Sequence, residues 1–392
     1  MSVYLHAIAT AVPETAYTQS ELRDIVKSQL PDRRSQRVVG MIYNSSAIEQ
    51  RHSVIRDLRL APGAEDGLFY NHAEALFKSP STGARNALYA QEAPKLFIEA
   101  ARRALEGCPD LTPADITHVV TVSCTGFYAP GPDYDVVRAL GLSPQTQRFH
   151  VGFMGCYAAF PALRMARAFC EAQPGAVVLV VCAELCTIHI RIEDDPDTLI
   201  ASSLFADGAS ATIVSQRELG AAQKLRMDGF ETTLTPLGVG ESDMAWKIGD
   251  QGFEMILSTY VPDIIESHIQ GALSPLLAAD ALLAAVPYRQ IDHWAVHPGG
   301  RSILDKVQSS LDLTDTQLAP SREVLRDYGN MSSATILFVL QKLIAEAGDG
   351  ERICAMAFGP GLTVETGLVT KSGVATAARS AQPELAGMGA DD

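Results

Sequence analysis

Residues 151–164 read VGFMGCYAAFPALR, so small residues lead into a single cysteine and an apolar, helix-forming stretch follows it. This order predicts that Cys156 lies at the N-terminus of a helix. Exposed backbone N–H groups and the positive end of the helix dipole favour the thiolate there, which is the form of cysteine that attacks acyl groups. The stretch therefore predicts an enzyme that works through a covalent acyl-cysteine intermediate.

Two segments far downstream offer the partners that such a nucleophile needs. Residues 294–300 (WAVHPGG) predict a buried strand that ends at His297, because turn-forming residues follow the histidine directly. In residues 328–334 (YGNMSSA), Asn330 is a good N-cap for the helix that the next apolar residues predict. An imidazole accepts a proton and a side-chain amide stabilises developing negative charge, so we expect both groups near Cys156.

Each of these residues has a plainer role when taken alone. A lone cysteine is usually a small buried hydrophobe, a lone histidine can be a hydrogen-bonded core residue, and Asn330 can be a cap and nothing more. The combination of all three segments in one chain favours the catalytic interpretation.

Composition sets limits on the class of protein. The chain has 392 residues, 47% of them apolar and 20% charged, which suits two subdomains that share a core. Its net charge of −15 argues against nucleic acid or an anionic membrane as a general partner. Seven cysteines show no metal spacing, so we expect reduced thiols and no metal. Without a transmembrane run or signal peptide, a cytoplasmic location is expected.

The order of the predicted elements indicates a duplicated unit. In the first half a helix over 94–107 precedes a strand over 116–123, and in the second half the segment 275–286 precedes a strand over 291–296. Two further apolar stretches form a matching pair of buried strands, at residues 176–182 and 353–358. Strands that alternate with helices predict an α/β fold with central sheets.

We place the boundary between the halves near Lys224. The N-terminal half is then 1–225 and carries the nucleophile, and the C-terminal half is 226–375 and carries the histidine and the asparagine. Residues 376–392 are rich in Ala and Gly and have little apolar pattern, so a mobile tail is expected.

At this point the sequence resembles a known family. Cys156, the segment around His297 and residues 329–333 (GNMSS) look like the three catalytic segments of type III polyketide synthases, the relatives of chalcone synthase. Residues 358–366 (FGPGLTVET) are similar to the glycine-rich loop of that family. The four segments occur in the family's order and span most of the chain. The resemblance implies a thiolase-like, duplicated αβαβα layered fold and a homodimer.

The resemblance also implies a mechanism without a cofactor. Cys156, paired as a thiolate with the imidazolium of His297, takes an acyl group from a coenzyme A or carrier-protein thioester. His297 and Asn330 then donate hydrogen bonds to the thioester oxygen of malonyl-CoA and stabilise the enolate that decarboxylation creates. The enolate attacks the acyl group, and repeated extension precedes closure to a pyrone or a resorcinol-type ring. Decarboxylation makes the carbanion without a strong base, so the site needs neither a carboxylate nor a metal.

Further residues are expected to line the substrate cavity. Phe205 and Phe253 fit gating roles, with ordinary aromatic packing as the alternative. Cys124, Cys186 and His189 stand where plant relatives usually carry threonine, so the chemistry of the cavity has changed, and we expect Cys124 to line it rather than to act as a redox group. The other expected cavity residues are Thr125, Ala129, Ser332, Gly359 and Pro360.

Ala129 falls where the family commonly has a methionine that reaches into the partner's cavity. A small residue there leaves room for a long aliphatic starter, as in bacterial alkylpyrone and alkylresorcinol synthases, because a methylene chain needs a continuous apolar path. We therefore expect a long-chain acyl starter.

Binding of coenzyme A phosphates has to differ from the plant pattern. The positions that carry basic residues in plant relatives are Val38, Met41 and Ser45 here. The positive charge near the N-terminus that could replace them is Arg33, Arg34, Arg37 and Arg51, with a solvated helix face as the alternative. Weak binding of coenzyme A would also suit an acyl carrier protein as the source of the starter.

Three rival functions use the same residues. A ketoacyl synthase of the fatty-acid initiation type shares the Cys, His and Asn logic but performs one condensation. A cysteine acyl hydrolase would release free acid, although no water-positioning carboxylate partner is evident. A non-catalytic binding protein on the same scaffold has no reason to keep every catalytic group.

Overall fold

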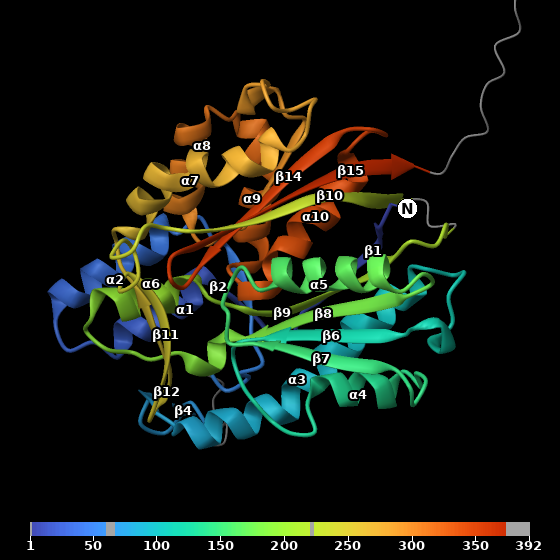
Figure 1. Ribbon diagram of the computed structural model, residues 1–392. Helices are drawn as coiled ribbons and strands as arrows, with labels where there is room; N and C mark the ends of the chain where they lie inside the picture. Colours follow the sequence, from blue (N-terminus) through green and yellow to red (C-terminus); the bar gives the residue numbers. More distant parts are fainter. Residues whose placement is uncertain (1, 60–66, 220–222, 374–392) are drawn as a thin grey trace, which may run out of the picture.

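One mixed sheet runs through the molecule, and the computed structural model describes residues 2–59, 67–219 and 223–373. Within these ranges nine strands follow the order β13-β14-β15-β10-β1-β9-β8-β6-β7 (Figure 1). Their bounds are β1 Tyr4–Ala11, β6 His118–Ser123, β7 Gln147–Gly152, β8 Val177–Leu185, β9 Asp207–Ser215, β10 Gln223–Leu234, β13 His293–Val296, β14 Arg352–Gly359 and β15 Thr363–Gly373.

The sheet divides into two halves at the contact between β1 and β10. These strands pair only at Tyr4 and Leu5, whereas β10 pairs with β15 over its whole length. In the first half β6 pairs in parallel with β7 and β8, and in the second half β13 pairs in parallel with β14. β6 and β8 are buried at every residue, as expected for strands that helices cover on both faces.

Helices cover both halves and also lie between them. α3 and α4 cover the first half, α7, α8 and α9 cover the second, and α5 and α10 lie between the two (Figure 1). The bounds of these helices are α3 Thr82–Glu106, α4 Pro132–Ala139, α5 Ala159–Ala172, α7 Val261–Ala278, α8 Arg301–Leu311, α9 Asp315–Tyr328 and α10 Thr335–Glu346. The order α, β, α, β, α confirms the α/β thiolase-like fold that the sequence predicted.

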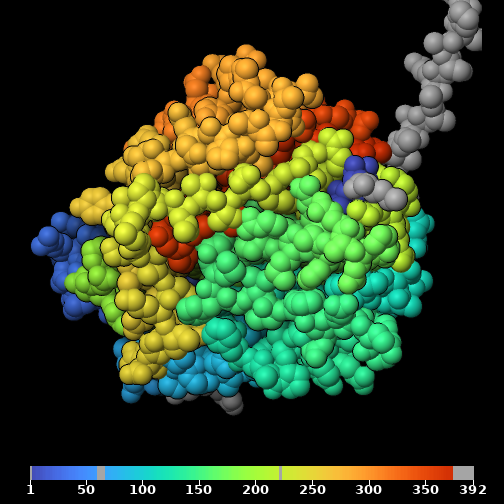
Figure 2. Space-filling view, viewed as in Figure 1, coloured from blue at the N-terminus to red at the C-terminus, as the bar shows by residue number. Residues whose placement is uncertain are grey.

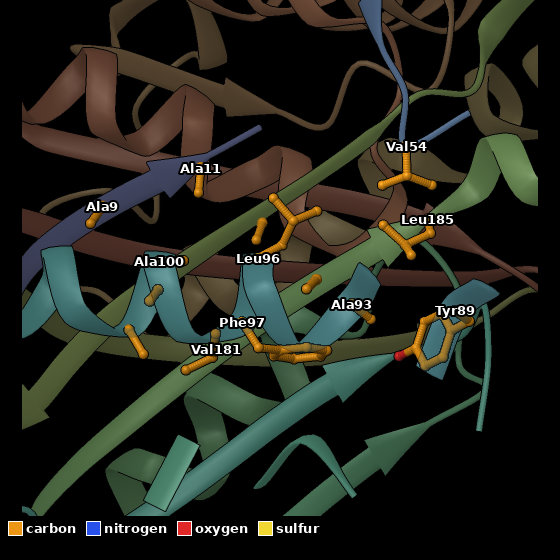
Figure 3. Packing of buried hydrophobic residues seen from close by; sticks show 14 of the residues in the cluster. Ala9, Ala11, Val54, Tyr89, Ala93, Leu96, Phe97, Ala100, Val181 and Leu185 are labelled. Atoms are coloured by element: carbon orange, nitrogen blue, oxygen red, sulfur yellow. The ribbon is translucent and has the colours of Figure 1, made fainter. Parts of the chain in front are cut away.

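Three clusters of buried apolar residues match these layers. One lies between α3 and the first half of the sheet, where Phe97 packs near Val181 of β8 (Figure 3). The second fills the centre and combines Phe160 of α5 with Ile336 of α10. The third lies under α7 and α8 and includes the fully buried ring of Trp294.

Shorter elements complete the described chain. Three pairs of short strands are β2 Ala16–Thr18 with β3 Gln50–His52, β4 Tyr70–Asn71 with β5 Leu76–Phe77, and β11 Met244–Gly249 with β12 Gly252–Leu257. The remaining helices are α1 Gln19–Ser28, α2 Arg33–Ser45 and α6 Pro196–Leu204, with short 3-10 helices at Pro113–Asp115, Cys186–His189, Tyr288–Gln290 and Ser332–Ala334. No helix of the described ranges is long and apolar enough to cross a membrane.

The predicted strands are confirmed, one predicted helix starts earlier than expected, and the segment 275–286 is mostly not helical. The strands expected at 116–123, 176–182, 291–296 and 353–358 are β6, β8, β13 and β14. The helix expected at 94–107 is α3, which begins twelve residues earlier after its N-cap Ser81 and continues through Pro94. The segment 275–286 holds only the end of α7, whose interior contains Pro275. In both cases burial of one apolar face keeps the helix continuous across a proline that the sequence marks as a start.

The division of the chain at residue 225 stays a prediction. Lys224 lies inside β10, the strand that joins the two halves of the sheet. Figure 2 shows the red loop that joins β14 to β15 at the bottom of a hollow, between the yellow-green chain of β10 and the green first half. The tail predicted at 376–392 lies outside the described residues.

Candidate active site

Cys156 lies in the turn between β7 and α5. The turn is closed by a hydrogen bond from the Ala158 amide to the Gly155 carbonyl, 3.1 Å long. α5 begins three residues after the cysteine, so the prediction of a thiol next to a helix N-terminus holds with a short turn in between. The side chain is only partly buried, which leaves the sulfur accessible.

The glycine-rich loop packs directly against this turn. Gly155 has a φ of +87°, and a Cβ there would lie 2.7 Å from Cδ of Pro360. A Cβ on Gly359 would lie 2.3 Å from the ring of Tyr157. Both glycines are therefore required for close packing, and the loop holds the residues on either side of the nucleophile.

Asn330 is placed by hydrogen bonds of its own side chain. Its Oδ1 accepts from the Ser332 amide at 2.8 Å, and its Nδ2 donates to the Gly299 carbonyl at 3.3 Å. Nδ2 also lies 4.0 Å from Sγ of Cys156. The prediction that Asn330 caps the helix of residues 334–340 is wrong, because a 3-10 turn over Ser332–Ala334 intervenes and α10 starts after Ala334.

His297 follows β13, as the sequence predicted, and its amide donates to the Met356 carbonyl at 2.8 Å. Its ring is 1% exposed, and within the described part of the chain neither ring nitrogen has a hydrogen-bond partner. Burial of an imidazole without a hydrogen-bond partner costs free energy. Because both ring nitrogens lack a partner, they are available to exchange a proton with a ligand or with Cys156.

Burial favours the neutral forms of both groups in the unliganded site. It raises the pKa of the Cys156 thiol to about 11, against the hydrogen bonds of Ser332 and Asn330, which lower it. It lowers the pKa of His297 to about 3. The ion pair predicted from the sequence is thus opposed by desolvation. Both groups are therefore neutral in the unliganded site.

Two cavities meet at Cys156. One, which we call the His297 cavity, has a volume of about 300 Å³ and is lined by His297, Asn330, Gly299 and Cys156. The other, which we call the Trp246 cavity, has a volume of about 290 Å³ and is lined by Trp246, His189 and Cys156 among others. The residues that line both are Cys156, Phe205, Met244 and Met255. The nucleophile therefore has access to two spaces, and Phe205 stands at their junction.

Most of the predicted cavity residues line the Trp246 cavity. They are Cys124, Thr125, Cys186, His189, Phe253, Ser332 and Pro360. Gly359 lines neither cavity and supports the turn instead. Ala129 also lines neither and is exposed at the surface of the single chain.

His189 connects the wall of this cavity to a neighbouring strand. Its Nδ1 accepts from the Phe253 amide at 2.9 Å, so its Nε2 carries the proton and donates to the Thr125 carbonyl at 2.7 Å. The ring stacks on Phe253 with centroids 4.2 Å apart. Burial lowers the pKa of His189 to about 3, so the ring stays neutral. Its two hydrogen bonds connect the backbone of Phe253 to that of Thr125.

Two residues that hold the backbone of Cys124 are among those that the sequence analysis missed. Trp246 in β11 donates from Nε1 to the Cys124 carbonyl at 2.8 Å, and no local motif marks it. Glu184 is fully buried in β8 and accepts from the Cys124 amide at 2.9 Å and from Thr125 Oγ1 at 2.8 Å. A signal for Glu184 existed, because it is the one charged residue in the apolar run at 177–186.

The predicted arginine cluster splits in two. Arg33, Arg34 and Arg37 are exposed on α2, and Arg33 and Arg37 line an open groove of about 560 Å³ together with Lys27. Arg51 is 3% exposed and is bonded to backbone carbonyls. Arg51 therefore lies apart from the groove of Arg33 and Arg37 and lines the Trp246 cavity, and a role for it in binding coenzyme A phosphates stays a prediction.

The seven cysteines are free thiols, as predicted. In the described ranges, no group of three or more His, Cys, Asp or Glu side chains is arranged to hold a metal ion.

Comparison with known proteins places this site in context. Residues 2–217 match the family of the N-terminal domain of chalcone and stilbene synthases, and residues 232–373 match that of the C-terminal domain. The alpha-pyrone synthesis polyketide synthase-like Pks18 of Mycobacterium tuberculosis is 32% identical over 369 residues, covering 92% of this chain and 89% of that protein.

Solved structures agree with the sequence comparison. PKS-I from the brown alga Ectocarpus siliculosus has a TM-score of 0.84 at 29% identity, covering 94% of this chain and 99% of its own. The C-terminal type III polyketide synthase domain of Steely1 from Dictyostelium has a TM-score of 0.83 at 26% identity, with coverage of 94% and 99%.

Proposed function

The chain belongs to the chalcone and stilbene synthase family and is a type III polyketide synthase, and from that premise we propose a course for its reaction. The enzyme loads an acyl starter on Cys156, extends it repeatedly with malonyl-CoA, and closes the product to an α-pyrone or a resorcinol-type ring. The observation that carries this proposal is the position of Cys156, which opens both to the cavity of His297 and Asn330 and to a second, mostly apolar cavity.

Loading begins with the neutral pair. The Cys156 sulfur attacks the carbonyl of the starter thioester while its proton moves to His297, whose ring nitrogens have no other partner in the described chain. The C–S bond to coenzyme A breaks, and the departing thiolate takes the proton back from the imidazolium. His297 returns to the neutral form that burial favours.

Extension uses the His297 cavity. The C–C bond to the malonyl carboxylate breaks, carbon dioxide leaves, and the electron pair becomes an enolate on the thioester oxygen. The free N–H of Asn330 Nδ2, held by the bond to Gly299, and the Nε2–H tautomer of His297 donate to that oxygen. The enolate carbon then attacks the acyl-Cys156 carbonyl, and the Cys156 sulfur leaves.

A long aliphatic starter is supported by the lining of the Trp246 cavity. Its apolar walls include Tyr17, Leu22, Ile55 and Leu58, none of which the sequence analysis singled out. Residues 51–58 lead from Arg51, which touches Phe205, to these side chains. We propose that the alkyl tail lies along this wall rather than past the exposed Ala129.

The remaining partners are also proposals. The groove of Lys27, Arg33 and Arg37 has cations without carboxylate partners in the described chain and would hold the phosphates of coenzyme A. Delivery by an acyl carrier protein, a homodimer and a cytoplasmic location remain predictions. Partly exposed aromatic rings at Phe127 and Tyr134, close to Ala129 in the sequence, would suit a dimer contact.

The test is mass spectrometry of the products made from malonyl-CoA and starters from acetyl-CoA to long-chain acyl-CoA, with Cys156→Ala as control. Pyrones or resorcinols from long starters, lost in the variant, are the expected result. Products of one condensation would favour the ketoacyl synthase alternative, and free acid alone would favour a hydrolase. Products from short starters only would overturn the proposed tail path.

A further inference from the structure

Arg51 lies at the C-terminal end of α6 and lines the Trp246 cavity beside Phe205. Its Nη1 donates to the carbonyls of Ser202 and Phe205, each at 2.8 Å, and its Nε donates to Oε1 of Gln19 at 3.0 Å. The last carbonyls of a helix lack intrahelical partners and carry partial negative charge. The guanidinium thus satisfies two of them and fixes the residue that stands between the cavities.

The other side of Arg51 touches the segment that carries the catalytic amide. Gly329 has a φ of +72°, and a Cβ there would lie 2.9 Å from Cγ of Arg51. The next residue, Asn330, donates its amide to the Leu204 carbonyl at 2.9 Å and accepts from the Ala206 amide at 2.9 Å. The arginine stem therefore packs against the backbone that pairs Asn330 with the Phe205 segment.

Burial of the Arg51 cation costs free energy, which indicates that its position has a function. Within the described residues the hydrogen bonds of Arg51 go to the Gln19 amide and to backbone carbonyls, not to a carboxylate, and its Nη2 has no hydrogen-bond partner. The guanidinium also lies over the ring of Tyr43, 5.7 Å from its centroid. Asp207 attracts it electrostatically, but that carboxylate is bonded to Thr187 and to the Val54 amide. Burial of a cation without an ion pair costs several kcal/mol in general. A buried arginine is retained where its planar guanidinium has to donate several hydrogen bonds in fixed directions.

Resting on the function proposed above, we propose that Arg51 is a positioning residue for condensation: it holds Phe205 and Asn330 in fixed relation to Cys156. Loading of the starter needs Cys156 and His297 alone, whereas extension also needs the Asn330 amide and the space that Phe205 delimits. A misplacement of about 1 Å lowers a rate by about 100-fold. Loss of the hydrogen bonds from the Arg51 guanidinium should therefore slow extension far more than loading.

The experiment compares Arg51→Lys with Arg352→Lys. Lysine keeps the charge at position 51 but cannot donate to Gln19 and to both carbonyls in one plane. Arg352 is the control, because it is a partly buried arginine, bonded to Asp228 and Asp280, and it lines neither cavity. Starter loading on Cys156 is measured by intact-protein mass spectrometry in a single turnover, and condensation by kcat and by the distribution of product lengths.

For Arg51→Lys we expect loading within about twofold of wild type, kcat lowered by about 100-fold, and a shift to products with fewer extensions. Arg352→Lys should leave the ratio of condensation to loading unchanged. Equal losses of loading and condensation in Arg51→Lys, or an unchanged product distribution, would overturn the proposal. A wild-type enzyme that makes no polyketide would instead contradict the proposed function itself.

A second variant keeps the test decisive if Arg51→Lys does not fold. Gln19→Leu removes the acceptor of Nε and leaves the two carbonyl bonds of Arg51 in place, and it also removes the Gln19 Nε2 bonds to the Ser203 carbonyl and to Ser46 Oγ. Loss of the bond to Arg51 should lower the ratio of condensation to loading by about 5-fold, the effect of about one hydrogen bond. An unchanged ratio in a folded Gln19→Leu protein would count against the role of Arg51.

Discussion

The His297 cavity and the Trp246 cavity share Cys156, but they are built in different ways. In the first, His297 and Asn330 are fixed by backbone contacts at element ends, through the Met356 carbonyl, the Gly299 carbonyl and the Ser332 amide. In the second, the walls are side chains from separate elements, such as Leu22 of α1 and Trp246 of β11. The difference indicates that backbone contacts fix the position of the catalytic residues. Side chains that can be exchanged without changing the backbone determine which substrate is accepted. Each prediction below tests this division.

The largest effect should come from the group that both cavities share. Cys156→Ala removes the nucleophile, and loss of a nucleophile lowers kcat by about 10⁴-fold or more. Product formation by mass spectrometry and the absence of an acyl-enzyme mass are the measurements. Because the Trp246 cavity keeps its walls, the variant should still be stabilised thermally by a long-chain acyl-CoA. Products at the wild-type rate would show that another group carries the acyl chain.

A change confined to the His297 cavity should separate loading from condensation. Asn330→Asp keeps the acceptor for the Ser332 amide but removes the Nδ2 donor, so condensation should fall by about 10²- to 10³-fold. Loading of the starter should change little. Ser302→Ala, which also lines this cavity, is the control and should be close to wild type in both steps. Equal activity of Asn330→Asp and Ser302→Ala would refute a role for the amide in stabilising the enolate.

The protonation state of Cys156 gives a pH dependence with a definite sign. A thiol with a pKa of about 11 is mostly protonated at neutral pH, so its thiolate fraction rises about tenfold for each pH unit between 7 and 10. The rate of alkylation of the unliganded enzyme by iodoacetamide, followed by mass spectrometry, should rise by about 100-fold from pH 7 to pH 9. A rate that is flat over this range would show instead that the thiolate–imidazolium pair predicted from the sequence exists before substrate binds.

The sequence was most informative where function depends on short, contiguous segments. Cys156, His297 and Asn330 each lie in a local pattern of small, turn-forming and apolar residues, and the four predicted buried strands, β6, β8, β13 and β14, are confirmed as well. What local patterns could not show is contact between distant segments. Trp246 meets Cys124, and Arg51 meets Phe205, only because the folded chain brings distant segments together. The sequence groups Arg51 with the arginines of residues 33–37 because its charge is visible there, whereas its burial is not.

The wall of the Trp246 cavity should govern chain length more than rate. Leu22→Trp adds bulk where we place the alkyl tail, and each buried methylene contributes about 0.8 kcal/mol. Exclusion of two methylenes should lower kcat/KM for a long-chain starter by about tenfold relative to a six-carbon starter. The assay compares a series of acyl-CoA starters.

Two controls sharpen this experiment. Leu22→Ile conserves volume and should keep the wild-type preference. Ala129→Trp alters an exposed residue that lines neither cavity of the single chain and should also keep it. If Ala129→Trp shortens the preferred starter and Leu22→Trp does not, the tail lies on the other side of the nucleophile, towards a partner subunit.

The smallest effect should come from the bond that ties β11 to the loop of Cys124. Trp246→Phe keeps an aromatic ring beside Phe253 but removes the Nε1 donor, and the Cys124 carbonyl loses that partner. The free energy of unfolding in urea should fall by about 1 to 3 kcal/mol. Trp294→Phe is a matched control, because its Nε1 donates to the Tyr288 carbonyl at 3.2 Å and its ring lines neither cavity. Both variants should lose similar stability, but only Trp246→Phe should also change the product pattern, by a few-fold at most. If the two variants alter the products equally, the Trp246 cavity has no special part in substrate choice, and the division between the two cavities fails.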